Sequence, residues 1–474
     1  MRVTLLLAAG ALALAGPLLA AEIPSDTWPM QRGSSAGSAS GVGAAAPEGL
    51  RDWAFQGRPT QVYQPGVPVW ASPAFAVVEG RPCVFIGGSD QTLHALDVAS
   101  QRRLWSKITN GSIVDAPCIA RVNGQQVVFW GASDRFVYAH AAADGRALWA
   151  RELVKPTNTQ GEARIPAPFC DGDTVYVTCF IFDKALARNR QEAFLFALDA
   201  ATGRVLWRHE LAHGPVNAPT GTRIGADLFL YVPARKGVLQ AFRVSREGAT
   251  AAWSFQMPHE VMGSPALWTG DAPMLFLGSK FGDLIALDAR TGEKRWHRMT
   301  GNWVDNNACC GVVAGRPTVF VGSNDYSLYA LRMDNGEVIW RRPLGGEVYT
   351  APCLFADKGR MLVAAACLDD RLYVADAASG KIEACFHTGQ PTWDKIAKGE
   401  TLWGSPIAVS GADGAAIIHG SYDGAVYVFP LAGDSRFRAT PQGDAGLWIG
   451  LAAVGILFSG VILPCILSRR ATQS

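Results

Sequence analysis

A repeat that ends in tryptophan is the feature of this sequence that most constrains its fold. Residues 197–207 read Ala-Leu-Asp-Ala-Ala-Thr-Gly-Arg-Val-Leu-Trp, and residues 286–296 repeat the pattern as Ala-Leu-Asp-Ala-Arg-Thr-Gly-Glu-Lys-Arg-Trp. Weaker copies end at Trp105, Trp149, Trp253 and Trp340. A pattern that recurs at this spacing indicates one structural unit used many times rather than several unrelated domains.

Two further segments carry parts of the repeat. One keeps Asp376 and Gly380 but has Ala384 where the tryptophan is expected, with Phe386 on the same strand face. The other lies at the front, where Trp53 follows a glycine at the same four-residue offset. We expect each tryptophan to dock its strand against the adjoining unit. The docking tryptophans are Trp53, Trp105, Trp149, Trp207, Trp253, Trp296 and Trp340.

A small residue followed by proline forms a second marker that alternates with the first. Between the fifth and sixth of these prolines, Cys309 takes the proline's place, and Cys118, Cys310 and Cys353 are expected at one repeat position beside the marker. Together the markers define eight units of roughly 43 to 54 residues, a period typical of propeller blades. The prolines are Pro73, Pro117, Pro168, Pro219, Pro265, Pro352 and Pro406.

Each unit contains short apolar runs separated by turns, which indicates four strands per unit. In the turn before the tryptophan strand, glycine supplies a positive φ and the preceding aspartate can accept turn N–H groups. The sequence therefore predicts an all-β, eight-bladed β-propeller of four-stranded blades over residues 50–431. Because the last unit ends without a tryptophan strand, we expect the N-terminal strand with Trp53 to close the last blade and remove the free edges.

Composition and motifs narrow the possible functions. With 43 basic and 41 acidic residues, a formal charge of +2 and 49% hydrophobic residues, the chain is neither disordered nor an expected nucleic-acid binder. Of the eight histidines, only His209 and His213 have a metal-ligand spacing, in a His-Glu-x-x-His pattern, but we expect them on a strand and a loop rather than on one helix face. We therefore predict no metal site. A Gly-x-Ser-x-Gly pattern occurs only at residues 33–37, in the Gly-, Ala- and Ser-rich segment before the propeller, and the phosphate-loop motif is absent from the sequence.

The two ends of the chain indicate a membrane-tethered, extracytoplasmic protein. Residues 1–21 read as a signal peptide, with an uncleaved anchor as the alternative, and residues 22–49 as a flexible segment. A linker at 432–445 precedes 446–467, an uncharged stretch of 22 residues that predicts a single C-terminal transmembrane helix. The basic tail, residues 468–474, would be cytoplasmic, with the propeller on the periplasmic side of the inner membrane. A cleaved cell-surface sorting tail is the alternative.

Loops and cysteines give further expectations. Two insertions, residues 180–191 and 388–401, are loops of the kind that bind partners on a propeller. Of ten cysteines, Cys465 lies in the membrane segment, so the body holds nine, an odd number. We expect most of them to be small buried residues on inner strands.

The Ala-x-Asp-x-x-Thr-Gly-x-x-x-Trp repeat resembles the tryptophan-docking repeat of the PQQ-like, eight-bladed propeller superfamily, over about residues 28–431. Residues 28–33, Trp-Pro-Met-Gln-Arg-Gly, resemble the start of many PQQ-like repeat proteins. The resemblance implies the fold. It leaves function open, because the superfamily includes quinoprotein dehydrogenases and also scaffolds that bind no quinone, such as the propeller lipoprotein of the outer-membrane barrel assembly machinery.

The loops entering the inner strands supply the candidate site. A quinoprotein would need a quinone between an aromatic floor and a cap, Ca²⁺ held by oxygen ligands, and a carboxylate base. For that alternative, Asp115 and Asp305 are the catalytic candidates. The alternative for the whole set is an axial rim that only solvates polar groups and caps the channel. The candidate rim residues are Trp70, Asp115, Asn217, Met262, Asp305, Asn306, Tyr349 and Trp403.

Adjacent cysteines lie over the quinone in the alcohol dehydrogenases of this superfamily, so the resemblance also draws attention to Cys309 and Cys310. Here the pair replaces the marker of the sixth unit rather than following the family's early position. As a vicinal disulfide the pair would be strained and easily reduced. As two thiols it would be a pair of small residues near the channel.

The sequence favours a scaffold that binds or assembles other proteins without catalysis and without a cofactor. Its expected partners are the membrane, through the C-terminal helix, and another extracytoplasmic or membrane protein. One alternative is a PQQ- and Ca²⁺-dependent dehydrogenase of alcohols or sugars. Another is a carbohydrate or small-ligand binder that uses Trp70 and Trp403 as stacking platforms.

Overall fold

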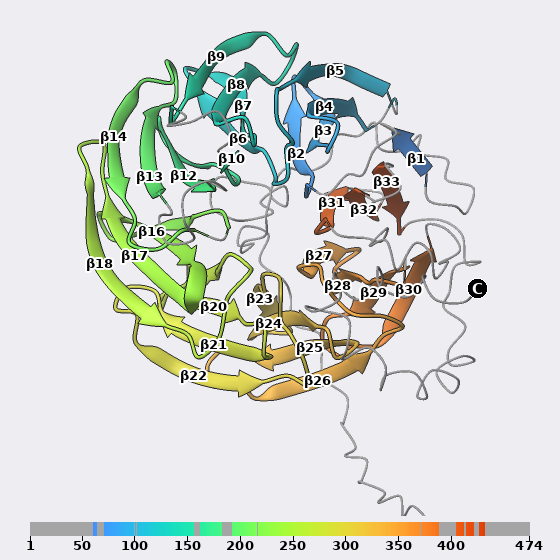
Figure 1. The fold of residues 1–474 in the computed structure, drawn as a ribbon. Helices are drawn as coiled ribbons and strands as arrows, with labels where there is room; N and C mark the ends of the chain where they lie inside the picture. Colours follow the sequence, from blue (N-terminus) through green and yellow to red (C-terminus); the bar gives the residue numbers. More distant parts are fainter. Residues whose placement is uncertain are drawn as a thin grey trace, which may run out of the picture.

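Eight antiparallel sheets form a closed ring in the computed structural model, as the repeats predict (Figure 1). The structure describes residues 60–63, 71–98, 100, 102–155, 162–182, 192–215, 217–369, 371–387, 404–411, 414–420 and 426–431. The expected signal peptide, Trp53, the linker, the segment 446–467 and the insertion 388–401 lie outside these residues. Within the described part, no helix is long and apolar enough to cross a membrane.

The first four blades follow one another along the chain. The first contains β2 (Ala74–Val78), β3 (Arg81–Gly87), β4 (Thr92–Asp97) and β5 (Arg102–Ile108). The second contains β6 (Cys118–Val122), β7 (Gln125–Gly131), β8 (Phe136–Ala141) and β9 (Ala147–Glu152). The third contains β10 (Glu162–Arg164), β11 (Phe169–Asp171), β12 (Thr174–Phe182), β13 (Glu192–Asp199) and β14 (Val205–Glu210). The fourth contains β15 (Thr220–Ile224), β16 (Asp227–Ala234), the 3₁₀ turn η3 (Arg235–Gly237), β17 (Val238–Val244) and β18 (Ala249–Gln256).

The remaining blades complete the ring. The fifth contains β19 (Ala266–Trp268), β20 (Met274–Gly278), β21 (Asp283–Asp288) and β22 (Lys294–Met299). The sixth contains β23 (Cys309–Val313), β24 (Arg316–Ser323), β25 (Ser327–Arg332) and β26 (Val338–Pro343). The seventh contains β27 (Cys353–Asp357), β28 (Arg360–Ala366), β29 (Arg371–Asp376) and β30 (Ile382–His387). The eighth contains β31 (Ile407–Gly411), β32 (Gly414–Gly420), β33 (Val426–Pro430) and β1 (Thr60–Tyr63).

The N-terminal strand closes the ring, as expected; the closing strand that the structure describes is β1, whereas Trp53 lies outside the described residues. Strand β1 pairs antiparallel with β33, and Thr60 stands opposite Val428 (Figure 1). Closure by a strand from the other end of the chain joins the termini of the domain and removes an exposed edge.

Eight hydrophobic clusters hold the ring together, each built from two consecutive blades. Successive side chains of one strand point to opposite faces of the sheet, so Val84 packs toward the eighth blade and Phe85 toward the second. Both faces of a blade are therefore buried. This explains why the middle strands read as continuous apolar runs rather than as an alternating pattern.

Each described docking tryptophan reaches the next blade. Its indole N–H donates to a backbone carbonyl there; the distances are 3.0 Å for Trp105, 2.9 Å for Trp149, 3.0 Å for Trp207, 3.3 Å for Trp253, 2.8 Å for Trp296 and 3.0 Å for Trp340. For five of these six tryptophans, all except Trp207, the turn glycine of the next blade lies against the indole ring. A Cβ added to Gly203, which has φ 68°, would lie 2.5 Å from Trp149. The repeat glycine therefore both forms the turn and leaves room for the indole ring of the preceding blade.

The seventh blade replaces the tryptophan with another aromatic contact. Phe386 lies 5.3 Å, centre to centre, from Phe429 of the eighth blade, within the cluster that joins these two blades. The substitution predicted from the sequence therefore serves the same interface.

Strand pairing corrects the alignment of the sixth unit by one residue. Cys309 pairs with Phe320, as Cys118 pairs with Phe129 and begins its strand in the same way. Cys309, not Cys310, is therefore equivalent to Cys118 and Cys353, and Ala308 takes the proline's place. In this unit two cysteines are adjacent and the proline is missing, so the sequence alone could not show which cysteine begins the strand.

The third blade departs from the four-stranded plan. Strands β10 and β11 both pair with the long strand β12, so this sheet has five strands. The start of the expected insertion, residues 180–182, is part of β12 rather than a loop, while residues 183–191 lie outside the described part. Strand β10 holds this extension, with Arg164 opposite Phe180.

Candidate functional site

One face of the ring gathers most of the chemistry. We call it the loop face: there, the loop that enters each blade's first strand meets the turn between its second and third strands. The contact is direct, because Ser323 Oγ donates to the carbonyl of Asn302 at 3.0 Å and Ser133 Oγ to that of Ser112 at 3.3 Å. The candidate rim residues that the structure describes precede first strands and belong to this face. Trp70 and Trp403 lie outside the described residues.

Three of the candidate rim residues link consecutive blades. Asp115 Oδ2 accepts the N–H of Ala167 at 3.2 Å. Asn217 Nδ2 donates to the Met262 carbonyl at 2.9 Å, and Asn306 Nδ2 donates to the Tyr349 carbonyl at 2.9 Å. Asp115, Asn217 and Asn306 each lie three residues before a first strand, so one repeat position supplies all three links. Their polar groups serve the interfaces between blades.

Asp305 is different, because its position is unfavourable for a charge. Its Oδ2 accepts a hydrogen bond from Asn324 Nδ2 at 3.1 Å, but its Oδ1 is buried and has no hydrogen-bond partner among the described residues. Burial raises the pKa of Asp305 to about 6, although the Asn324 hydrogen bond and the Lys280 charge act in the opposite direction. A carboxylate kept in such a place is a candidate functional group.

Asp305 belongs to a cluster between the sixth and seventh blades. Burial, and then the Asp305 charge, raise the pKa of Glu347 and of Tyr349. Asn324 is only 3% exposed, and its Oδ1 also has no partner among the described residues. Within the described residues, however, no group of three or more His, Cys, Asp or Glu side chains is arranged to hold a metal ion.

The vicinal cysteines do not act as one unit. Cys309 packs in the cluster between the sixth and seventh blades, and Cys310 packs in the cluster between the fifth and sixth. Both are fully buried, because successive residues of strand β23 face opposite sides of the sheet. Both are free thiols, which agrees with the alternative of two small residues rather than with a vicinal disulfide. They are small core residues in two different interfaces.

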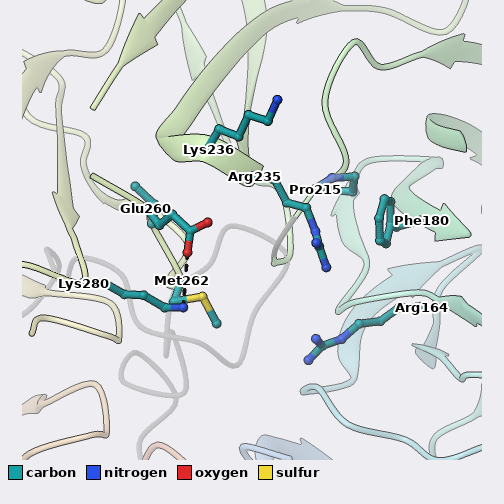
Figure 2. A pocket seen from close by; sticks show the side chains of 9 residues that line it. Arg164, Phe180, Pro215, Arg235, Lys236, Glu260, Met262 and Lys280 are labelled. Carbon is teal, nitrogen blue, oxygen red and sulfur yellow. Dashed lines mark hydrogen bonds and ion pairs between the residues drawn. The ribbon is translucent and has the colours of Figure 1, made fainter. Parts of the chain in front are cut away.

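A basic hollow that the sequence did not reveal lies on the loop face of blades three, four and five (Figure 2). Its volume is ≈ 200 Å³. Figure 2 shows the guanidinium groups of Arg164 and Arg235 directed toward the same space, with the Lys280–Glu260 ion pair at another wall. The lining residues are Arg164, Phe180, Pro215, Arg235, Lys236, Glu260, Val261, Met262 and Lys280.

Local backbone structure fixes the walls of the hollow. The Arg235 N–H donates to the Gly214 carbonyl at 2.9 Å, and Pro215 forms a bridge with Ala234. Lys236 has φ 62°, and its carbonyl accepts a hydrogen bond from Gln256 Nε2 at 2.7 Å. The turn that carries the basic pair is therefore held from both sides.

A sequence signal for the hollow exists in the turns between second and third strands. The first and second blades have aspartate there, at Asp90 and Asp134, whereas Phe281 has the equivalent place in the fifth. The aspartates are structural: Tyr138 donates to Asp134 Oδ2 at 2.6 Å, and His94 Nε2 lies 3.0 Å from Asp90 Oδ2. A change from acidic to aromatic at this position marks the fifth blade, where Phe281 stands next to Lys280 of the hollow.

Exposed apolar side chains stand beside the hollow on the fifth blade. Phe281 is 63% exposed, Met299 57% and Met262 40%. The Phe281 ring stacks on His259, with ring centres 4.2 Å apart. His259 is in turn fixed by Asp283 at 2.7 Å, which also contacts His297 Nε2 at 2.9 Å. Phe281 is therefore an exposed aromatic ring on an ordered support.

Comparison with known proteins agrees with this architecture. The profile of the family described as outer membrane protein assembly factor BamB matches residues 42–191, 133–308 and 280–444. Over 115 residues the chain is 31% identical to the serine/threonine-protein kinase AfsK of Streptomyces griseus, which covers 23% of this chain and 14% of the kinase. The chain thus spans about a seventh of that relative.

Solved structures share the fold at low sequence identity. The quinohemoprotein alcohol dehydrogenase ADHIIG of Pseudomonas putida HK5 superposes with a TM-score of 0.62 at 12% identity, over 89% of this chain and 83% of that one. Sqt1 of Saccharomyces cerevisiae gives 0.61 at 12%, over 79% and 100%. A europium-containing methanol dehydrogenase gives 0.57 at 14%, over 76% and 85%. The matched profile extends across the whole ring, and the chain therefore belongs to the PQQ-like propeller family described as outer membrane protein assembly factor BamB.

Proposed function

We propose that this protein is a non-catalytic scaffold that binds another protein through the loop face of blades three to five. We call the binding surface the docking patch and define it as the basic hollow together with Met262, Phe281 and Met299. One observation carries the proposal: apolar and basic side chains are exposed side by side here, and Phe281 has an ordered support. Aromatic, methionine and arginine side chains are enriched at protein interfaces.

Phe281 is the expected anchor of the interface. A stacked, pre-ordered ring loses little side-chain freedom when a partner covers it, so more of the burial energy remains for binding. Hot-spot residues are commonly aromatic and lie near the centre of an interface. The positive charges beside the ring would steer and orient the partner.

The family supports a scaffold role, since its description is that of an assembly factor. The proposal places the propeller on the periplasmic side of the inner membrane, with residues 446–467 as the anchor. That placement rests on the signal-like residues 1–21 and on the uncharged stretch before Arg469 and Arg470.

The described residues do not fit a bound PQQ with its Ca²⁺. Cys309 and Cys310, which the resemblance places over the quinone, lie in two separate cores. Both oxygens of Asp115 accept backbone N–H groups, those of Ala116 and Ala167. Asp305 has a raised pKa, as a base would need, but a raised pKa alone does not make a quinone site.

The proposal is tested on the full chain extracted from its native membranes in mild detergent. We expect it to migrate on native gels as a complex larger than the chain alone. Phe281→Ser should release the free chain, whereas Val338→Ser, which changes an exposed residue on the outer strand of blade six, should not. A complex unaffected by Phe281→Ser would contradict the docking patch. Dye-linked oxidation of alcohols or sugars that depends on added PQQ and Ca²⁺ would contradict the non-catalytic role.

A further inference from the structure

We propose that the basic hollow binds carboxylate side chains of an acidic segment in the partner protein. The inference rests on the function proposed above and names the chemistry of the partner. It starts from charge: four basic side chains and one acidic side chain line the hollow. The whole chain carries a formal charge of only +2, so this concentration is local.

The arginines are arranged to accept carboxylates. Arg235 lies over the Phe180 ring, 5.0 Å from its centre, which holds the side chain at the wall. Arg164 stands opposite Phe180 in the strand register and enters the same space (Figure 2). A planar guanidinium binds a carboxylate through two parallel hydrogen bonds, and a pre-ordered one loses less freedom on binding. The pair therefore forms a ready receptor for one or two acidic side chains.

The acidic group of the hollow does not block it. Glu260 pairs with Lys280 at 3.3 Å, with the two side chains 59% and 31% exposed. An exposed ion pair of this kind contributes little to stability. An incoming carboxylate can therefore replace Glu260 as the partner of Lys280.

The shape of the hollow favours a protein segment over a membrane surface or a free inorganic anion. The space is concave, and Phe180, Pro215, Val261 and Met262 give it apolar walls. Phe281 stands next to Lys280 and would cover the adjoining apolar residue of the same segment. A flat headgroup layer would reach neither wall, and an inorganic anion would use neither the apolar walls nor Phe281.

The test uses two fluorescein-labelled twelve-residue peptides, one of alternating Glu and Phe and one of alternating Gln and Phe, with fluorescence anisotropy at low salt. We expect the Glu peptide to bind the full chain at least tenfold more tightly than the Gln peptide. Arg164→Glu and Arg235→Glu should each weaken binding about tenfold. Arg332→Glu, a charge-matched change at the far end of its blade, should leave it within about twofold. Unchanged melting temperatures would show that the variants are folded.

Several results would overturn the inference. These are equal binding of the two peptides, no binding of the Glu peptide below about 1 mM, or equal loss with Arg332→Glu. If inorganic phosphate displaced the Glu peptide completely at concentrations near the dissociation constant of phosphate for the chain, the hollow would be a small-anion site. Arginine-dependent binding to phosphatidylglycerol vesicles in place of the peptide would indicate a membrane surface. The native-gel test with Phe281→Ser reports on the proposed function separately, so either idea can fail alone.

A second inference has an independent basis in two cysteines. We infer that Cys118 and Cys170 form a disulfide that joins the inner strands of blades two and three. Their sulfur atoms are 3.0 Å apart, and both residues are buried. Strands β6 and β11, which carry them, have Cα atoms within 8 Å of one another. Bridged cysteines have Cα atoms about 4.4 to 6.8 Å apart, so little backbone movement is needed.

The reaction needs an external oxidant, which we take to be a disulfide such as oxidised glutathione or an oxidoreductase of the same chemistry. One cysteine thiolate attacks the oxidant, forms a mixed disulfide and releases one thiol. The second cysteine then attacks the mixed disulfide and releases the second thiol, so two electrons and two protons pass to the oxidant. Burial raises the pKa of Cys170 in the closed ring. The bond would therefore form during folding, before blades two and three close.

The test is peptide mass spectrometry of the full chain folded with oxidised glutathione, unfolded in an alkylating agent and digested without reductant. We expect one cross-linked peptide pair that contains Cys118 and Cys170, and no alkylation at either residue. Reductant should lower the melting temperature of the wild type and of Cys353→Ala, a matched change at the equivalent position of blade seven. It should not affect Cys118→Ala. Alkylation of both residues in the wild type would overturn the inference.

Discussion

At the residue scale, the polar side chains of the loop face are of two kinds: those that hydrogen-bond to a neighbouring blade and those that do not. Asp115, Asn217 and Asn306 come from one repeat position and link blades through backbone groups. Asp305 is one residue away from that position and has a buried oxygen without a partner among the described residues. Sequence alone proposed all four as one rim, because a difference of one residue in a loop changes a side chain's partners but not its type.

Replacing Asp305 should stabilise the fold at neutral pH. Its pKa is raised from 3.8 to about 6, so the ionised form is less favourable in the folded state than in the unfolded state. Stability should therefore rise as the pH falls from 6 toward 4. At pH 7.5, Asp305→Asn should be more stable than the wild type by about 1 to 3 kcal/mol, with the difference vanishing below about pH 4. Urea unfolding at several pH values measures this, and an equal difference at pH 4 and 7.5 would disprove it.

His140 should have the opposite dependence on pH. It is 7% exposed, and burial, with a smaller effect of Lys107, lowers its pKa from 6.5 to about 4. The unfolded chain therefore gains a proton first as the pH falls, and stability is lost between 6.5 and 4. His140→Gln should reduce the stability lost between pH 7.5 and 5 by about 1 to 2 kcal/mol. An unchanged slope in urea unfolding would contradict the assignment.

At the element scale, five pairs of consecutive blades are joined through a docking tryptophan and the turn glycine of the next blade. Both residues were visible as the repeat, and the fold they predict is present in the structure. The repeat could not show that the turn glycine packs against the tryptophan of the preceding blade, since that contact joins segments about 50 residues apart. The hollow was missed for a related reason: it unites loops of three blades, each unremarkable by itself.

The packing of Gly203 against the Trp149 ring predicts that Gly203→Ala lowers the free energy of unfolding more than Gly172→Ala does. Gly203→Ala places a Cβ 2.5 Å from the Trp149 ring, whereas Gly172→Ala, also at positive φ, meets no atom within 4 Å. Gly172→Ala should cost about 1 kcal/mol from backbone strain, and Gly203→Ala about 3 kcal/mol or more. Urea unfolding measures both. In a Trp149→Ala background the two glycine changes should lower the free energy of unfolding by nearly the same amount. A persistent difference would contradict the role of the glycine–indole contact.

At the scale of the whole molecule, the ring depends on a strand from the other end of the chain. The pattern of units predicted closure by an N-terminal strand, and β1 provides it. No tryptophan marks β1, which pairs with β33 through a short irregular register. The signal peptide, the membrane tether and the periplasmic location of the propeller stay predictions from the two ends of the sequence.

Removing the closing strand should open the ring. A chain that begins at residue 64 lacks β1 and leaves the outer edge of β33 unpaired, whereas a chain that begins at residue 59 keeps it. We expect the shorter chain to unfold at lower urea concentration and to self-associate through the free edge. Light scattering after size exclusion measures the association. A monomer of undiminished stability would show that β1 is not needed for closure.

The docking patch is tested most directly by a photo-crosslinking amino acid at position 281 in the full chain, irradiated in native cells. The proposed function predicts one discrete protein adduct from position 281 that is absent from the same substitution at Val338. The adduct should weaken when Arg235 is changed to Glu. Equal labelling from positions 281 and 338, or no adduct at all from 281, would contradict binding of a partner through this face.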